Sequence, residues 1–310
     1  MSAVGDRASG PRPGRRAATA LTLALALVGT AGCTLTERAG PGGDVLAALE
    51  EVRYESPPPT GLTYVDATRA NELRTEDAER FAFVAGLGTP LLNLRDLPAE
   101  RYGLVPGDAE TTVTVDFGAP FGHWDGSFDA AAIVDDLAAD GFTERETDAG
   151  TVWISHDRGL GLMVTDDRIH WGDEQLNPAR TESSGEPLAA RDAYRDLADC
   201  LGDVYRADFV QAREGAAVPV HAVGHRAEAA DETSTVLCAV TEDEATADAA
   251  LERLREEVER ATTRYAGAEV SALDAGGSVG VRVTVPDRPE QRPGRLLAGD
   301  TDLTDALREL

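Results

Sequence analysis

Hydrophobic residues follow two different periods along most of the chain. Residues 111–117 place apolar side chains at every second position, as a half-buried strand does. Residues 247–261 instead carry an apolar stripe at helical spacing that includes Ala250, Leu254 and Val258. Because the helices and hairpins form separate groups rather than alternating βαβ units, the pattern predicts an α+β fold.

The order helix, strand, helix, hairpin occurs twice, and the first helix of each half is predicted from Asp66 to about Ala85 and from Pro187 to Tyr205. In the first half the strand at 111–117 precedes a hairpin that turns at Asp148-Ala149-Gly150. In the second half the strand at 235–240 precedes a hairpin that turns at Asp274-Ala275-Gly276, 126 residues later. Sequence identity between the halves is slight, so independent domains with a common layout stay an alternative to a repeat. We predict two similar α+β domains, each with helices packed on a mainly antiparallel sheet.

The N-terminus has the pattern of an export signal. A segment with several arginines precedes an apolar run from Ala17 to Val28, which is too short to cross a bilayer comfortably. The following Thr30-Ala31-Gly32-Cys33 resembles the lipobox of prokaryotic lipoproteins, although Thr30 stands where that family usually has Leu or Val. The resemblance implies cleavage before Cys33, acylation of this Cys, and a chain held on the outer face of the cell membrane. An ordinary signal peptide with an incidental Cys33 is the alternative.

Clusters of Gly, Pro and polar residues set the expected boundaries. Residues 34–59 have the composition of a linker around one short helix at 44–52. The predicted organisation is a signal peptide at 1–32, a lipidated Cys and flexible tether at 33–60, a first α+β domain at 61–176, a linker at 177–186, a second α+β domain at 187–286, and a polar tail with a short terminal helix at 287–310.

Acidic residues outnumber basic residues throughout the chain. The 56 Asp and Glu residues face 29 basic residues, all of them Arg, and the formal charge is -27. Loss of the signal peptide makes it -30, because four arginines and one aspartate leave. A dispersed acidic excess resembles the surface of halophilic proteins, and a GC-rich genome is a second explanation for the lack of Lys. The charge argues against nucleic acid as a partner. The expected partners are the membrane, through the lipid anchor, and an envelope protein or small ligand.

Two cysteines remain after Cys33. Cys200 and Cys238 form an even pair in an exported chain, so we predict a structural disulfide between them. Two buried free thiols are the alternative. Neither Cys has His or Cys neighbours at metal-ligand spacing.

Two similar motifs are the candidates for a binding site. His123-Trp124-Asp125 and His170-Trp171-Gly172-Asp173 each place an imidazole near an indole and a carboxylate at the end of a predicted strand. If they converge, they form a small site for a divalent cation or a polar ligand. The alternative is two independent loops whose tryptophans cover the edge of the core. The candidate ligand-binding residues are His123, Trp124, Asp125, His170, Trp171 and Asp173.

Two further motifs do not support catalysis. The sequence from Gly276 to Gly280 matches a serine-hydrolase elbow, but a strand follows the Ser and no His comes later, so a hairpin turn is the better explanation. His221 and His225 have the spacing of a helical zinc pair but lie in a predicted strand, where about 13 Å separates them. We expect them to face solvent. We therefore assign no catalytic residue, metal ligand or cofactor.

These observations favour a lipid-anchored extracytoplasmic protein that binds a ligand or a partner without catalysis. The alternative is an extracytoplasmic hydrolase or metal-dependent enzyme that uses the His and Asp residues of the first domain. Close approach of His123 and His170 in the fold would favour this enzyme alternative, and wide separation would exclude it.

Overall fold

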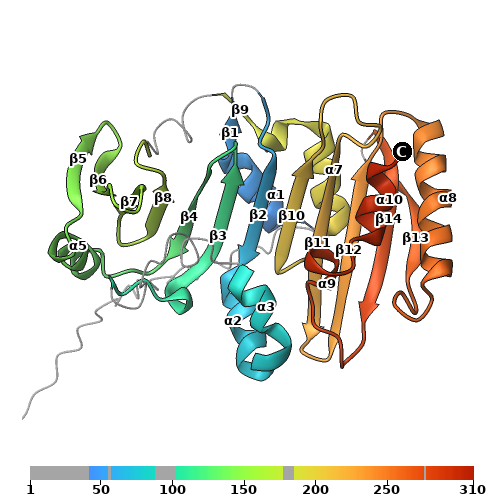
Figure 1. Ribbon diagram of the computed structural model, residues 1–310, viewed down its shortest axis with the longest axis horizontal. Helices are drawn as coiled ribbons and strands as arrows, with labels where there is room; N and C mark the ends of the chain where they lie inside the picture. The colour runs from blue at the N-terminus through green and yellow to red at the C-terminus, as the bar shows by residue number, and fades with distance from the viewer. Residues whose placement is uncertain (1–41, 55–56, 88–101, 177–184, 276) are drawn as a thin grey trace, which may run out of the picture. The chain divides into compact units, whose positions relative to one another are not determined.

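The computed structural model describes residues 42–54, 57–87, 102–176, 185–275 and 277–310. Within these ranges twelve strands join in one sheet, and every neighbouring pair is antiparallel. The predicted α+β class is therefore confirmed (Figure 1). The strand order across the sheet is β13-β14-β12-β11-β10-β2-β3-β4-β8-β7-β6-β5.

The strands follow the alternation of the sequence. The first half contributes β2 (Gly61–Asp66), β3 (Ala109–Asp116), β4 (Pro120–Gly126), β5 (Thr143–Thr147), β6 (Gly150–Ser155), β7 (Leu160–Val164) and β8 (Arg168–Gly172). The second half contributes β10 (Arg206–Gln211), β11 (Val220–Ala229), β12 (Glu232–Val240), β13 (Glu269–Ala275) and β14 (Ser278–Asp287). The short strands β1 (Arg53–Tyr54) and β9 (Glu186–Pro187) form a separate pair.

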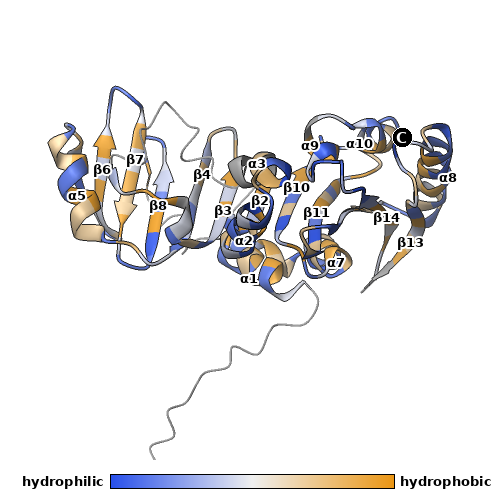
Figure 2. Cartoon of the chain, turned by 90° about the horizontal axis from the view of Figure 1, so that it is seen from below, coloured by the Kyte–Doolittle hydropathy of each residue, from blue (hydrophilic) through white to orange (hydrophobic). Residues whose placement is uncertain are grey.

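Helices cover both faces of the sheet (Figure 2). One face, called face A here, packs its side chains against α1 (Gly43–Glu51), η3 (Leu188–Ala190) and α7 (Asp192–Leu201). The opposite face, face B, carries one apolar cluster with α5 (Ala130–Ala139) and another with α8 (Glu244–Arg260), α9 (Arg295–Ala298) and α10 (Asp302–Arg308). The short η2 (Pro106–Asp108) precedes β3. No helix in these ranges is long and apolar enough to cross a membrane.

The two predicted domains meet in the middle of the sheet. Strand β2 of the first half pairs with β10 of the second half, and Val65 lies opposite Arg206 in this register. The predicted linker at 177–186 falls largely outside the described residues. The structure thus joins the halves by main-chain hydrogen bonds, while their division into two domains stays a prediction.

Both ends of the described chain contribute to the core. In α1 the side chains of Val45 and Leu49 are buried on face A, beside α7. In α10 Leu303 and Leu307 are buried against α8. Both helices were predicted, but their burial in the core differs from the flexible tether and polar tail that we expected around them, because their apolar residues fall on one helical side. Cys33 and the predicted signal peptide lie outside the described residues.

The helical segment after β2 is divided. We expected one helix from Asp66 to about Ala85, and the structure has α2 (Ala67–Glu76) and α3 (Ala78–Leu87). Asp66 accepts a hydrogen bond from the Arg69 amide, and Asp77 accepts one from the Arg80 amide. Each aspartate therefore caps a helix, and the second cap begins a new helix at Ala78.

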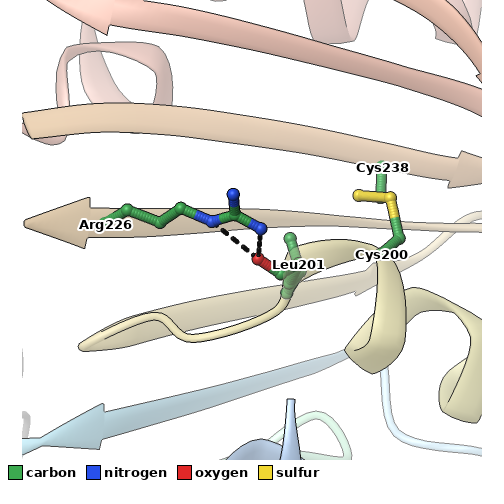
Figure 3. The surroundings of a disulfide bond; sticks show 4 residues. All are labelled: Cys200, Leu201, Arg226 and Cys238. Atoms are coloured by element: carbon green, nitrogen blue, oxygen red, sulfur yellow. Dashed lines mark hydrogen bonds between the residues drawn. A yellow bond between two sulfur atoms is a disulfide. The ribbon is translucent and has the colours of Figure 1, made fainter. Parts of the chain in front are cut away.

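The predicted disulfide is present. Cys200 at the end of α7 bonds to Cys238 in β12, with a Cα–Cα distance of 6.3 Å (Figure 3). Nearby, the Arg226 guanidinium donates hydrogen bonds from Nε and Nη2 to the carbonyl of Leu201. Both contacts fix the C-terminal end of α7 on face A, where terminal carbonyls need donors.

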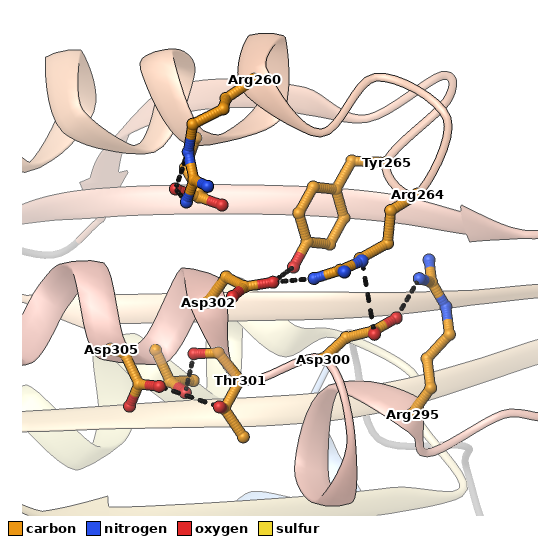
Figure 4. A network of polar contacts seen from close by, with 10 residues as sticks. Arg260, Arg264, Tyr265, Arg295, Asp300, Thr301, Asp302 and Asp305 are labelled. Atoms are coloured by element: carbon orange, nitrogen blue, oxygen red, sulfur yellow. Dashed lines mark hydrogen bonds and ion pairs between the residues drawn. The ribbon is translucent and has the colours of Figure 1, made fainter.

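An ion-pair network fixes the C-terminal helices beside α8 (Figure 4). Arg264 pairs with Asp302 at the start of α10 and with Asp300, and Arg295 also pairs with Asp300. The hydroxyl of Tyr265 donates to Asp302. The network joins the loop after α8 to both terminal helices, although such partly exposed pairs contribute little stability individually.

The expectation that His221 and His225 face solvent is wrong. Both lie in β11, as predicted, but only 4% and 1% of their surfaces are exposed. Strand β11 is interior to the sheet, between β10 and β12, and helices cover both faces. Sequence periodicity placed the two side chains on one face but did not show that this face is covered.

Burial of His225 predicts an acid-sensitive fold. Burial, together with the nearby Arg206, lowers the pKa of His225 to about 4, whereas an unfolded His titrates near 6.5. The unfolded chain binds the proton first, so stability is lost as pH falls from about 6.5 to about 4. We expect this residue alone to lower the unfolding free energy by about 2 kcal/mol between pH 7 and pH 5.

Urea unfolding at the two pH values measures this effect. His225→Gln should reduce the pH-dependent loss by about 2 kcal/mol, because the titrating group is gone. His156→Gln is the matched control, since the side chain of His156 is 68% exposed. Equal pH dependence in wild type and His225→Gln would contradict the prediction.

Candidate functional site

The two predicted motifs meet at a pair of histidines on face A. Strands β4 and β8 are neighbours in the sheet, and His123 lies directly opposite His170 in their register. The ring centroids are 5.9 Å apart, and the planes are inclined by 62°. Antiparallel pairing thus brings together two residues that are 47 positions apart in the sequence.

Two carboxylates and one guanidinium surround His123. Its Nε2 lies 3.5 Å from Glu51 Oε2, at the end of α1, and 3.4 Å from Asp125 Oδ2, two residues further along β4. Arg168 of β8 pairs with both carboxylates, through Nη2 at 2.9 Å from Glu51 Oε2 and through Nε on Asp125 Oδ1. The hydroxyl of Thr111 also donates to Asp125 Oδ2 at 3.2 Å. We call Glu51, His123, Asp125, Arg168 and His170 the histidine centre.

Burial and contacts within the histidine centre determine the charges of Asp125 and His170. Burial raises the pKa of Asp125, but the contacts with His123 and Arg168 outweigh it and bring the pKa to about 2. Burial lowers the pKa of His170 to about 4, with smaller contributions from His123 and Arg168 in the same direction. At neutral pH the centre therefore presents an ionised Asp125 beside a neutral His170, and both can act as ligands or hydrogen-bond acceptors.

A small cavity adjoins the two imidazoles. Its volume is about 30 Å³, and its walls include His123, His170 and Glu51 together with the apolar side chains of Phe121 and Leu176. A single water needs about 10–15 Å³, and sites for organic ligands typically have several hundred. Among the described residues, a cavity of this volume therefore fits an ion with its water better than an organic ligand.

The tryptophans of the motifs point away from the centre. Trp124 and Trp171 alternate with the histidines along their strands, so they face the opposite side, where both are fully buried in the apolar cluster beside α5. Gly122 permits this packing, because a Cβ there would lie 2.1 Å from the Val113 carbonyl and 3.0 Å from the Trp171 indole. The tryptophans thus hold β4 and β8 in place and do not line the cavity.

Asp173 is also outside the centre. It lies just after β8 in a bend, is exposed, and accepts a hydrogen bond from the Gln175 amide. His156 pairs with Glu174 at 2.7 Å and is likewise exposed. Of the six candidate binding residues, the structure brings together His123, Asp125 and His170.

Known proteins resemble this chain in structure but not in sequence. No known protein family and no curated protein matches this sequence. Among solved structures, crystal form I of TP0453 is similar with a TM-score of 0.48 and 10% sequence identity, over 84% of this chain and 96% of that chain. Crystal form IV of TP0453 has a TM-score of 0.44 and 10% identity, over 78% of this chain and 92% of that chain.

The sequence motifs did not include Glu51 and Arg168. Glu51 comes from a helix that precedes the first predicted domain, and no local pattern places this helix against β4. Arg168 was visible as a residue of a predicted strand, two positions before His170. Because residues i and i+2 of a strand share a face, Arg168 could have been expected on the same face as His170.

Proposed function

We propose that this protein is held on the outer face of the cell membrane through acylated Cys33 and binds a small ligand at the histidine centre without catalysing a reaction. The anchoring rests on the lipobox resemblance at residues 30–33. The exported location agrees with the Cys200–Cys238 disulfide, because disulfides persist in oxidising compartments.

One observation carries the binding role. Side chains from α1, β4 and β8 converge on a cavity of about 30 Å³, which Glu51, His123 and His170 line, and Asp125 lies beside His123. Such a cavity favours a ligand the size of an ion or of water over an organic molecule. The close approach of His123 and His170 also supports the enzyme alternative, but an enzyme needs room for a substrate next to the reacting groups, so the small volume favours binding over catalysis.

Fractionation and native mass spectrometry test the two parts of the proposal. Wild-type protein should separate with membranes, and Cys33→Ser should be released, because a lipid chain supplies the membrane affinity. In detergent, native spectra of wild type should show a non-covalent mass that denaturation removes. His123→Ala should lack this mass because the variant loses the central imidazole.

His156→Ala serves as the matched control, since His156 is exposed and outside the histidine centre. It should retain the bound mass. Membrane association of Cys33→Ser equal to wild type would contradict the anchoring. A wild-type spectrum without any non-covalent mass would contradict the binding role.

A further inference from the structure

We infer that the ligand of the histidine centre is a divalent transition-metal ion such as Zn²⁺, coordinated by Glu51, His123 and Asp125. This inference rests on the proposed binding function and names its ligand. One carboxylate oxygen from each acidic residue and one imidazole nitrogen all lie within 4.8 Å of one another. Residue 51 comes from α1 and residues 123 and 125 from β4, so tertiary packing assembles the set.

The distances from the His123 nitrogen to the two carboxylate oxygens are close to those between ligand atoms of a tetrahedral metal site. His123 Nε2 lies 3.4 Å and 3.5 Å from its two carboxylate oxygens, whereas good N–H···O bonds measure about 2.7–3.2 Å. Bonds of about 2.0–2.1 Å to a tetrahedral zinc separate the ligand atoms by about 3.4 Å. The imidazole nitrogen is therefore almost equally distant from the two oxygens, at about the spacing of a tetrahedral edge.

The donor types select the ion. One imidazole with two carboxylates suits Zn²⁺ and the neighbouring transition metals, whereas Ca²⁺ and Mg²⁺ prefer oxygen ligands alone. Three protein ligands leave a fourth position, which water occupies in many zinc sites. The cavity of about 30 Å³ beside His123 and His170 supplies the space for that water.

Arg168 pairs with both carboxylates of the proposed metal site. Its Nε contacts Asp125 Oδ1, whereas the other oxygen, Oδ2, faces His123. Asp125 can therefore hold the guanidinium with one oxygen and the ion with the other, as hydrogen-bonded carboxylate ligands do. Arg168 also pairs with Glu51 Oε2, so metal binding requires Glu51 to share this oxygen or to present Oε1. With two carboxylates and one guanidinium, the centre has a formal charge of −1 that attracts a cation.

Titration with Co²⁺ tests the inference. The full-length lipidated protein in detergent is stripped with a chelator, returned to high salt to screen its acidic surface, and titrated with Co²⁺, then with competing Zn²⁺. We expect one ion per chain, with visible absorption of the intensity typical of tetrahedral Co²⁺. His123→Ala and Asp125→Asn should each weaken binding at least hundredfold, and His156→Ala should leave it unchanged.

The outcomes separate this inference from the proposed function. Equal Co²⁺ affinity in wild type and His123→Ala, or no saturable binding, would overturn the metal assignment. If native spectra still show a mass that His123→Ala loses, the binding role stands with another ligand. X-ray absorption of the zinc form supplies a second readout that is independent of folding differences among variants. It should show one imidazole among oxygen ligands, and a shell of oxygen alone would contradict the assignment.

Discussion

Removal of the Cys200–Cys238 disulfide should lower the unfolding free energy by about 3–4 kcal/mol. The bond closes a loop of 38 residues, and restriction of a loop of that length in the unfolded chain accounts for about 4 kcal/mol. Both cysteines are buried between α7 and the sheet, so Cys200→Ala/Cys238→Ala leaves only small voids and chiefly reports the loss of the crosslink. Urea unfolding measures the difference.

Reductant provides the matched control for this prediction. Added reductant should destabilise the wild type by a similar amount and should leave the double variant unchanged, because that variant has no disulfide to reduce. Wild-type stability that does not respond to full reduction would show that the loop is already restricted in the unfolded chain.

Loss of the buried carboxylate of Asp208 should cost about 3–5 kcal/mol. Arg206 and Asp208 form a two-point ion pair on face B, from Nε to Oδ2 and from Nη2 to Oδ1, at 2.6 Å each. Only 4% and 8% of their surfaces are exposed, so Asp208→Asn leaves a buried guanidinium without its counter-charge. Thr63 would also lose a charged acceptor, because its hydroxyl donates to Asp208 Oδ1 at 2.8 Å.

Two further variants separate charge burial from packing. Arg206→Met/Asp208→Leu removes both charges and should recover most of the lost stability, since an apolar pair needs no desolvation of ions. Glu72→Gln breaks the exposed pair with Arg69 and should change stability by less than about 1 kcal/mol. If Asp208→Asn behaves like Glu72→Gln, water reaches the Arg206 side chain and the prediction fails. Urea unfolding of the wild type and the three variants measures these differences in stability.

Local patterns predicted the elements of the fold but not their connections. The helix predicted from Pro187 to Tyr205 and the two Asp-Ala-Gly hairpins depend on residues that are close in sequence, and the structure has them as η3 with the shorter α7 (Asp192–Leu201), β5–β6 and β13–β14. The pairing of β2 with β10 depends on residues more than 130 positions apart. Alternation along a strand specifies its two faces and gives no information on the neighbouring strand, so the single sheet was not predictable.

The candidate site was predictable to the same extent. The similarity of the two motifs suggested their convergence, and the structure brings together His123, Asp125 and His170. The two-residue period would also have shown that Trp124 points the other way, a conclusion that requires the strand to extend through the whole motif, as β4 does. Glu51 could not be identified, because only packing of α1 on face A brings it to His123.

The burial of α1 limits how far the body of this protein can extend from a membrane. If Cys33 carries the lipid, only residues 34–42 separate the anchor from the first residue of a helix that is part of the core. Ten fully extended residue steps cover at most about 35 Å, whereas a tether of 26 residues could reach about 90 Å. The folded part of the protein would then stay close to the lipid surface, and any partner would have to bind it there.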